Sequence, residues 1–270
     1  MSVAEKQSPA TPKDVAFYRE NGFIRYPGFF SRDEVAALGD AIDLAIETNR
    51  ERIVGAPAGG RTSEAYEKVF NQMVNLWTDF PDVKTYSFHH ALAETARRLS
   101  VCRHVRIYHD HAMVKPGGSG SRATNWHQDL PYWPMEPDGA LSAWVAVDDV
   151  TVENGCLHFV PGSHRLGPQE PIALGVAGES IVAKMAEKGH AVAEPVAMEM
   201  AAGGVTFHHG CNFHHAGPNL TDRPRRAFAV IYIPDYVRFT GGKDAAGAAD
   251  EMTAGGPWEH PLHPILAGSP

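Results

Sequence analysis

VRIYHDHAMVK, residues 105–115, is the first of six short strand-like stretches that follow one another along the chain. The other five are LSAWVAVDDV (141–150), CLHFVPGSH (156–164), PVAMEM (195–200), GGVTFHH (203–209) and RRAFAVIYIP (225–234). Glycine, proline and aspartate lie between them, as is typical of short strands joined by turns. The chain from residue 101 to about residue 240 is therefore predicted to be mainly β.

The residues before this region favour helices. TPKD (11–14) combines a capping threonine, a proline at the first helical position and an acid in the first turn, which predicts a helix to about Asn21. SRDE (31–34) is an S-x-x-E capping box followed by apolar residues at helical spacing. Two more helices are expected over about residues 63–77 and 81–99. A helical layer before short strands predicts helices on one face of a small β-sandwich or barrel of the jelly-roll type.

The length of 270 residues allows a sizeable core, and we expect a single domain over residues 1–270. Its helix-rich part would span residues 1–100, its jelly-roll core about 101–240, and a C-terminal loop and tail 240–270. The segment TGGKDAAGAADEMTAGGP (240–257) is rich in glycine, alanine and aspartate and has almost no large apolar residue. This composition predicts a mobile surface loop.

Composition narrows the class of partner. The net charge of -8, with 15 histidines counted as neutral, offers no basic surface to a nucleic acid or an anionic membrane. No apolar run is long enough to span a bilayer, and MSVAEKQSPA (1–10) lacks the apolar core of a secretory signal, so the cytoplasm is the expected location. Cys102, Cys156 and Cys211 are widely spaced and are expected to be buried thiols. A small-molecule partner is predicted.

His127 and Asp129 lie one residue apart in NWHQDLPYWP (125–134). On a strand, side chains at i and i+2 point to the same face and lie roughly 6 to 7 Å apart, so both can reach one metal ion. An imidazole and a carboxylate suit Fe(II), Mn(II) or Zn(II), but a secure site needs a third ligand. A lone H-x-D pair is more often a hydrogen-bonded turn than a metal site.

The downstream stretch HHGCNFHHAGPNLTDRPRRAF (208–228) supplies candidates for that ligand. It holds four histidines within eight residues, followed by Arg223, Arg225 and Arg226. One of the histidines could complete a facial triad of two histidines and one carboxylate, which leaves three coordination positions open for chemistry. If a 2-oxo acid takes two of them, its distal carboxylate needs a fixed cation, for which the planar guanidinium of arginine is suited.

Four stretches together resemble the phytanoyl-CoA dioxygenase (PhyH) family of Fe(II)- and 2-oxoglutarate-dependent oxygenases. The resemblance covers most of the chain. The family implies a double-stranded β-helix as the core, which is a jelly-roll, cupin-like fold. The stretches are FYRENGFIRYPGFFSRDEVAAL (17–38), MVKPGGSGSRATNWHQDLPYW (113–133), LSAWVAVDDVTVENGCLHFVPGSHRLG (141–167) and FHHGCNFHHAGPNLTDRPRRAFAVIYIP (207–234).

The resemblance assigns roles in the second half of the site. In the family the distal histidine lies five residues before the asparagine of a P-N pair, and the arginine that binds 2-oxoglutarate lies eleven residues after that histidine. Counting from Asn219 gives His214 and Arg225. His215 is the chief rival ligand because a shift of one residue would select it. Many members carry serine or threonine two residues after the distal histidine, where this chain has Ala216.

The resemblance also places three further residues near the co-substrate. Gln128 lies between the two proximal ligands, Lys115 lies on the strand that enters the motif, and Trp144 matches a tryptophan that projects toward the metal pocket. The alternative for each is structural: a solvated glutamine, a surface lysine and a core tryptophan.

The resemblance implies a reaction. Fe(II) held by His127, Asp129 and His214 would use dioxygen and 2-oxoglutarate, release succinate and CO2, and hydroxylate an unactivated C–H bond of a small metabolite or natural-product intermediate. Related halogenases have a small residue in place of the carboxylate, so Asp129 favours hydroxylation. Desaturation and ring formation need the same triad and stay open. The rival hypotheses are a zinc-type metallohydrolase and a catalytically inactive binding module on the same barrel.

Overall fold

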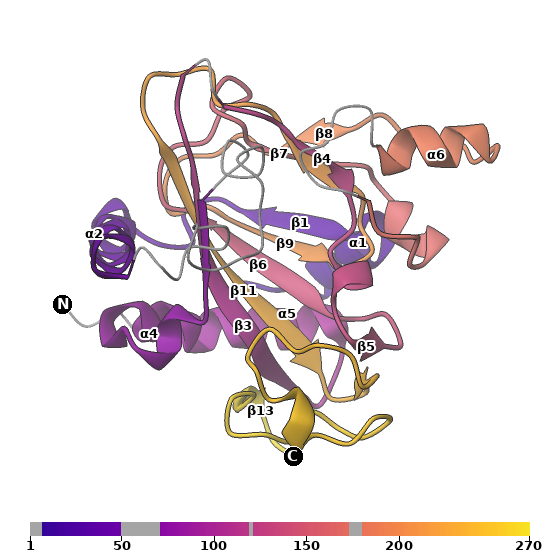
Figure 1. Ribbon diagram of the computed structural model, residues 1–270. Helices are drawn as coiled ribbons and strands as arrows, with labels where there is room; N and C mark the ends of the chain where they lie inside the picture. Colours follow the sequence, from indigo (N-terminus) through magenta and orange to yellow (C-terminus); the bar gives the residue numbers. More distant parts are fainter. Residues whose placement is uncertain (1–6, 50–70, 119–120, 173–179) are drawn as a thin grey trace.

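A twisted antiparallel sheet of seven strands forms the centre of the molecule (Figure 1). The computed structural model describes residues 7–49, 71–118, 121–172 and 180–270. Along the sheet the strands run in the order β1, β9, β6, β11, β3 and β13, and β2 pairs with β3 beside that path. Their bounds are β1 Phe23–Tyr26, β2 Asn71–Val74, β3 His104–Lys115, β6 Leu141–Ala146, β9 Val205–His209, β11 Arg225–Pro234 and β13 Ile265–Gly268.

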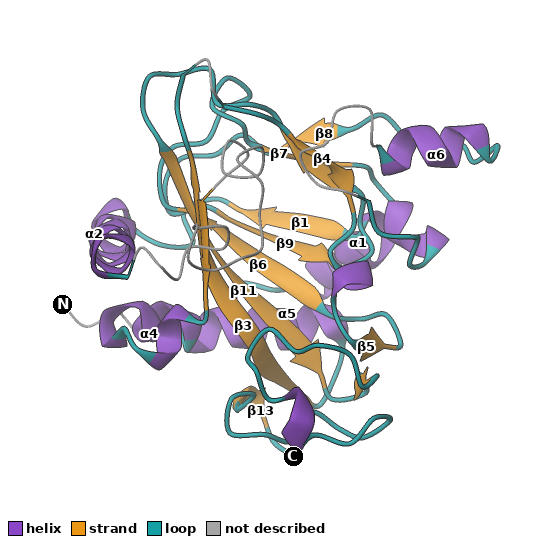
Figure 2. Ribbon diagram, viewed as in Figure 1, coloured by secondary structure: helices purple, strands orange, loops and turns teal. Residues whose placement is uncertain are grey.

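A second, smaller sheet lies across one face of the first. Its order is β4, β10, β7 and β8, with bounds Thr124–His127, His214–Ala216, Leu157–Phe159 and Val196–Ala197. A short ribbon of β5 (Met135–Glu136) and β12 (Arg238–Phe239) adjoins them. Two antiparallel sheets face to face form the predicted jelly roll (Figure 2).

Helices cover the outer face of the large sheet, as predicted. They are α1 (Pro12–Asn21), α2 (Arg32–Thr48), α4 (Pro81–Ser87) and α5 (His90–Ser100), and the short α6 (Ile181–Glu187) lies beside the small sheet. Both predicted N-caps are confirmed, because Thr11 and Ser31 accept hydrogen bonds from the backbone amides three residues later within complete capping boxes. Alternation along β11 divides the core: Phe228 and Val230 pack on the helices, while Ala229 faces the small sheet.

Two helix predictions are corrected. Residues 71–74 of the predicted helix 63–77 form β2, because pairing with β3 overrides local helical preference, and a 3-10 turn (Leu76–Thr78) follows; residues 63–70 lie outside the described residues. The predicted helix 81–99 is two helices, because His89 adopts an extended backbone and caps a new helix by accepting from the amide of Leu92.

Residues 240–257 form mostly exposed loop and turns, in agreement with the predicted surface loop. Two contacts anchor this loop: Asp244 accepts a hydrogen bond from His263, and Ala248 is buried. Beyond the loop, β13 extends the large sheet at its edge. The three cysteines are free and buried, which confirms the prediction of buried thiols. Among the helices of the described residues, none is long and apolar enough to cross a bilayer.

Candidate metal and co-substrate site

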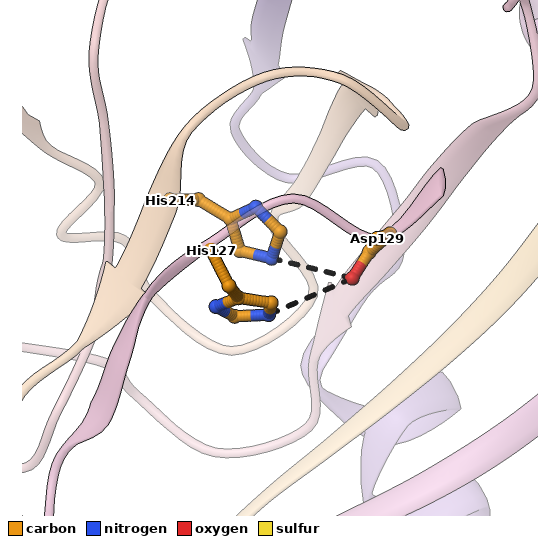
Figure 3. A group of neighbouring side chains, drawn as sticks. All are labelled: His127, Asp129 and His214. Atoms are coloured by element: carbon orange, nitrogen blue, oxygen red, sulfur yellow. Dashed lines mark ion pairs between the residues drawn. The ribbon is translucent and has the colours of Figure 1, made fainter. Parts of the chain in front are cut away.

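His127, Asp129 and His214 converge at one end of the small sheet. His127 ends β4 and His214 begins β10, and the two residues are direct antiparallel partners. The Nε2 atoms of both histidines lie 3.6 Å from Asp129 Oδ1, and all three ligand atoms lie within 4.8 Å of one another (Figure 3). Ligand atoms about 2.1 Å from a divalent ion and at right angles lie about 3.0 Å apart, so a small contraction would suffice to bind one. Among the described residues, these three side chains form the one cluster of histidine, cysteine or acidic residues that could hold a metal ion.

Backbone carbonyls fix both imidazoles in the form that binds metals. His127 Nδ1 lies 2.6 Å from the carbonyl oxygen of Asn125, and His214 Nδ1 lies 3.0 Å from that of Asn212. Because a carbonyl only accepts, each Nδ1 carries the proton and each Nε2 presents its lone pair toward Asp129. Burial also lowers the pKa of His214 to about 3, so this ring is neutral. Two imidazoles and a carboxylate that converge in this way fit a divalent cation.

Hydrogen bonds from neighbouring side chains hold one of the two carboxylate oxygens of Asp129. Its Oδ2 accepts hydrogen bonds from Ser142 Oγ at 3.2 Å and from His208 Nε2 at 3.3 Å, while Oδ1 faces the two histidines. Asp129 is therefore an oriented carboxylate. His208 and Ser142 support the orientation of Asp129. The sequence did not reveal Ser142 as a supporting residue.

Arg225 lies at the start of β11 with its guanidinium inside the protein. Its residue is only 4% exposed, and its Nη2 donates to the carbonyl of Gly155 at 3.3 Å. The guanidinium carbon lies 5.3 Å from the ring centre of Trp144, which fixes its plane. Its Nε has no hydrogen-bond partner among the described residues, and burial lowers its pKa to about 10. A buried cation with open donors fits a carboxylate ligand.

The three residues that the resemblance places near the co-substrate lie in different surroundings. Trp144 lines the cavity, as predicted. Lys115 is buried and pairs with Arg225 across the strands, but its Nζ donates to the carbonyl of Arg122 at 2.8 Å and it does not line the cavity. Burial, with help from the charge of Arg225, lowers its pKa to about 7. Gln128 donates to two backbone carbonyls and accepts from the amide of Gln169, so its amide holds loops together outside the cavity.

The remaining histidines and arginines are placed elsewhere. His215 borders the cavity, but its ring packs at a tilt against Trp126 and His158, with ring centres 4.3 Å and 4.7 Å away. It is not one of the three converging ligands. His209 accepts from the amide of Cys211. Arg226 forms ion pairs with Asp43 and Asp148.

A cavity of about 660 Å³ joins the candidate ligands to Arg225. Ala216, where many family members carry a hydroxyl, lines it with a methyl group. Further lining comes from β2, β3, the aromatic run after Asp129 and the segment 243–245. The prediction missed His109 and His111, although their H-x-H spacing on a strand is the same signal that singled out H-x-D.

Comparisons with known proteins identify the family. The model of the phytanoyl-CoA dioxygenase (PhyH) family matches residues 18–227. The chain belongs to this family. Phytanoyl-CoA dioxygenase domain-containing protein 1 of Bos taurus is 26% identical over 83% of this chain and 93% of its own length. The ectoine dioxygenase of Bordetella bronchiseptica is 29% identical over 81% of this chain and 73% of its own.

Solved structures extend the likeness of this PhyH family member. SnoK, described as a non-heme alpha ketoglutarate dependent carbocyclase from nogalamycin biosynthesis, has a TM-score of 0.78 at 26% identity and covers 96% of this chain and 97% of its own. The epimerase SnoN, in complex with Fe3+, alpha ketoglutarate and nogalamycin RO, has a TM-score of 0.72 at 26% identity and covers 94% and 97%. The chain is thus an Fe(II)- and 2-oxoglutarate-dependent dioxygenase, with O2 as the other co-substrate.

Proposed function

We propose that His127, Asp129 and His214 bind the Fe(II), that Arg225 binds the distal carboxylate of 2-oxoglutarate, and that the enzyme hydroxylates an unactivated C–H bond of a small molecule. The observation that carries the assignment is the pairing of two features in one cavity: a convergent triad of two imidazoles and a carboxylate, and a buried guanidinium with an open donor. When bound, the iron and 2-oxoglutarate supply oxidative decarboxylation to succinate and CO2 and the oxidising power for the C–H bond.

The protein contributes orientation. Asn125 and Asn212 carbonyls hold the two imidazoles, and the hydrogen bonds of His208 and Ser142 turn Asp129 so that Oδ1 faces them. The face of Trp144 and the carbonyl of Gly155 fix the Arg225 guanidinium. Because these supports are formed by strands of both sheets, the geometry is set before any ligand binds.

Ring formation is the second candidate reaction. SnoK is described as a carbocyclase, and its fold and chain length match this chain closely. Isotope labelling separates the two reactions: a hydroxylated product carries one oxygen atom from 18O2, and a cyclised product carries none. Succinate release over a panel of small neutral metabolites would identify the substrate for this measurement.

Metal and co-substrate binding are tested without turnover. Anaerobic Fe(II) and 2-oxoglutarate should produce a weak charge-transfer band in the visible spectrum of the protein. His214→Ala should abolish the band, while His215→Ala, the matched change at the neighbouring position, should keep it. Loss of the band only in His215→Ala would overturn the ligand assignment. A protein that binds Zn(II) but never forms the band would instead support the hydrolase or the inactive module.

A further inference from the structure

The inner face of β3 carries polar side chains that the proposed iron and 2-oxoglutarate sites do not use. Tyr108, His109 and His111 all line the cavity. Two adjacent residues, Tyr108 and His109, can both do so because the register with β11 shifts between Ile231 and Tyr232, which leaves Tyr108 as an extra residue on β3. Bulges of this kind re-aim side chains next to active sites.

His111 presents a hydrogen-bond donor. The Nε2 of Gln72 on β2 lies 2.7 Å from His111 Nδ1. An amide nitrogen only donates, so Nδ1 is the acceptor, and the single ring proton resides on Nε2. Burial lowers the pKa of His111 to about 3, in agreement with a neutral ring. No described residue hydrogen-bonds to His111 Nε2, so this N–H is available to a ligand in the cavity.

His109 presents the complementary acceptor. Its Nδ1 lies 3.3 Å from the backbone carbonyl of Asp110. A carbonyl only accepts, so Nδ1 carries the proton. Burial lowers the pKa of His109 to about 4, which leaves Nε2 as a lone pair. The centres of the two imidazole rings are 5.2 Å apart, so one donor and one acceptor lie side by side on the cavity wall.

The rest of the wall is mostly aromatic and aliphatic and offers little charge. Tyr108 and Trp133 meet edge to face at 5.9 Å, and Tyr132 also lines the cavity. The carboxylate of Asp244 is bonded to His263 at 3.1 Å. Apart from the groups assigned to iron and 2-oxoglutarate, the charged side chain left to a ligand among the described lining residues is Lys243, which is exposed. An uncharged substrate with flat rings fits such a wall.

We propose that His109 and His111 recognise the substrate by hydrogen bonds, with Gln72 as a positioning residue. The substrate is an uncharged ring compound with an acceptor oxygen for His111 and a hydroxyl group for His109. This inference rests on the proposed function, because the substrate binds beside the iron and 2-oxoglutarate. It adds what that function leaves open, namely the polar groups by which the substrate is recognised.

The test uses two rigid probes that differ in one group. 9-Fluorenone offers only an acceptor, and 9-fluorenol offers a hydroxyl. Their affinities are measured by calorimetry on the protein loaded anaerobically with Fe(II) and 2-oxoglutarate. His111→Phe should weaken fluorenone binding about five- to tenfold and fluorenol binding less, because a hydroxyl can still donate to His109. His109→Phe should weaken fluorenol binding and spare fluorenone, which has no donor. Gln72→Leu keeps the imidazole and should reduce the preference for fluorenone. His190→Phe, at an exposed position, is the matched control.

The outcomes separate this inference from the proposed function. Equal weakening of both probes in both variants, or no binding of either probe to the unmodified protein, would overturn the substrate assignment. The charge-transfer band should persist in His109→Phe and His111→Phe. If the unmodified protein lacks that band, the proposed function fails, whatever the probes do.

Discussion

Replacing Arg225 by methionine removes the guanidinium while keeping an unbranched apolar side chain of similar length. The guanidinium is buried, makes one long hydrogen bond to Gly155, and its Nε meets no hydrogen-bond partner in the described part of the chain. A bidentate contact between guanidinium and carboxylate consists of two charge-assisted hydrogen bonds worth about 1.5–3 kcal/mol each. Their loss in a buried site, at about 3–5 kcal/mol, should weaken 2-oxoglutarate binding roughly 10²- to 4 × 10³-fold.

The same variant should not destabilise the ligand-free protein. A buried cation without a carboxylate is costly, so Arg225→Met should leave the free energy of unfolding unchanged or raise it. Iron affinity should also stay unchanged, because the guanidinium makes no hydrogen bond to the three candidate ligands. The adjacent Arg226→Met is the matched control: it breaks ion pairs with Asp148 and Asp43, and should reduce stability without affecting 2-oxoglutarate.

The assay is anaerobic titration of 2-oxoglutarate into the Fe(II)-loaded protein, followed by the charge-transfer band, with thermal unfolding of the ligand-free protein measured in parallel. Parallel weakening of iron and 2-oxoglutarate by Arg225→Met would refute the assigned role. So would an unchanged affinity for 2-oxoglutarate.

Three further changes test other parts of the structure. His208→Phe removes a donor to Asp129 Oδ2 and should weaken iron binding about 10- to 100-fold in a metal titration, and unchanged affinity would contradict its supporting role. Gly155→Ala places a Cβ 2.6 Å from the carbonyl oxygen of Gly217 at a φ of +84°, and should lower stability by about 1–3 kcal/mol in chemical denaturation. Hydrogen bonds from two arginines lower the pKa of Glu94 to about 2 from the usual 4.5, so its stabilising effect is present above pH 4.5 and is lost as the pH falls toward 2. Glu94→Gln should therefore flatten the pH dependence of unfolding in that range, and a profile like that of the unmodified protein would count against this ion pair.

Local signals in the sequence predicted those elements that depend on local chemistry. The capping boxes at Thr11 and Ser31 fixed two helix starts because a cap is formed by residues three apart. The strand β2 was missed because its partner, β3, lies more than thirty residues away, and pairing of this kind leaves no mark on helical spacing. The helix break at His89 was missed because histidine is a less common N-cap residue than serine, threonine or aspartate.

The candidate site likewise contains residues that the sequence reveals and residues that it does not. The pair His127 and Asp129 is visible as a strand motif, whereas His214 could be chosen over His215 only through the family spacing. The structure gives the physical reason for that choice, since alternation along β10 aims the two rings in opposite directions. Ser142 could not have been found from the sequence, because only the packing of the two sheets brings it to Asp129.

Anomalous diffraction at the iron edge, from crystals grown anaerobically with Fe(II) and 2-oxoglutarate, tests the central claim most directly. A single strong peak is expected about 2.1 Å from His127 Nε2, Asp129 Oδ1 and His214 Nε2, with a carboxylate of the co-substrate on the guanidinium of Arg225. A peak at another place, or the ring of His214 turned away from the other two ligands, would contradict it.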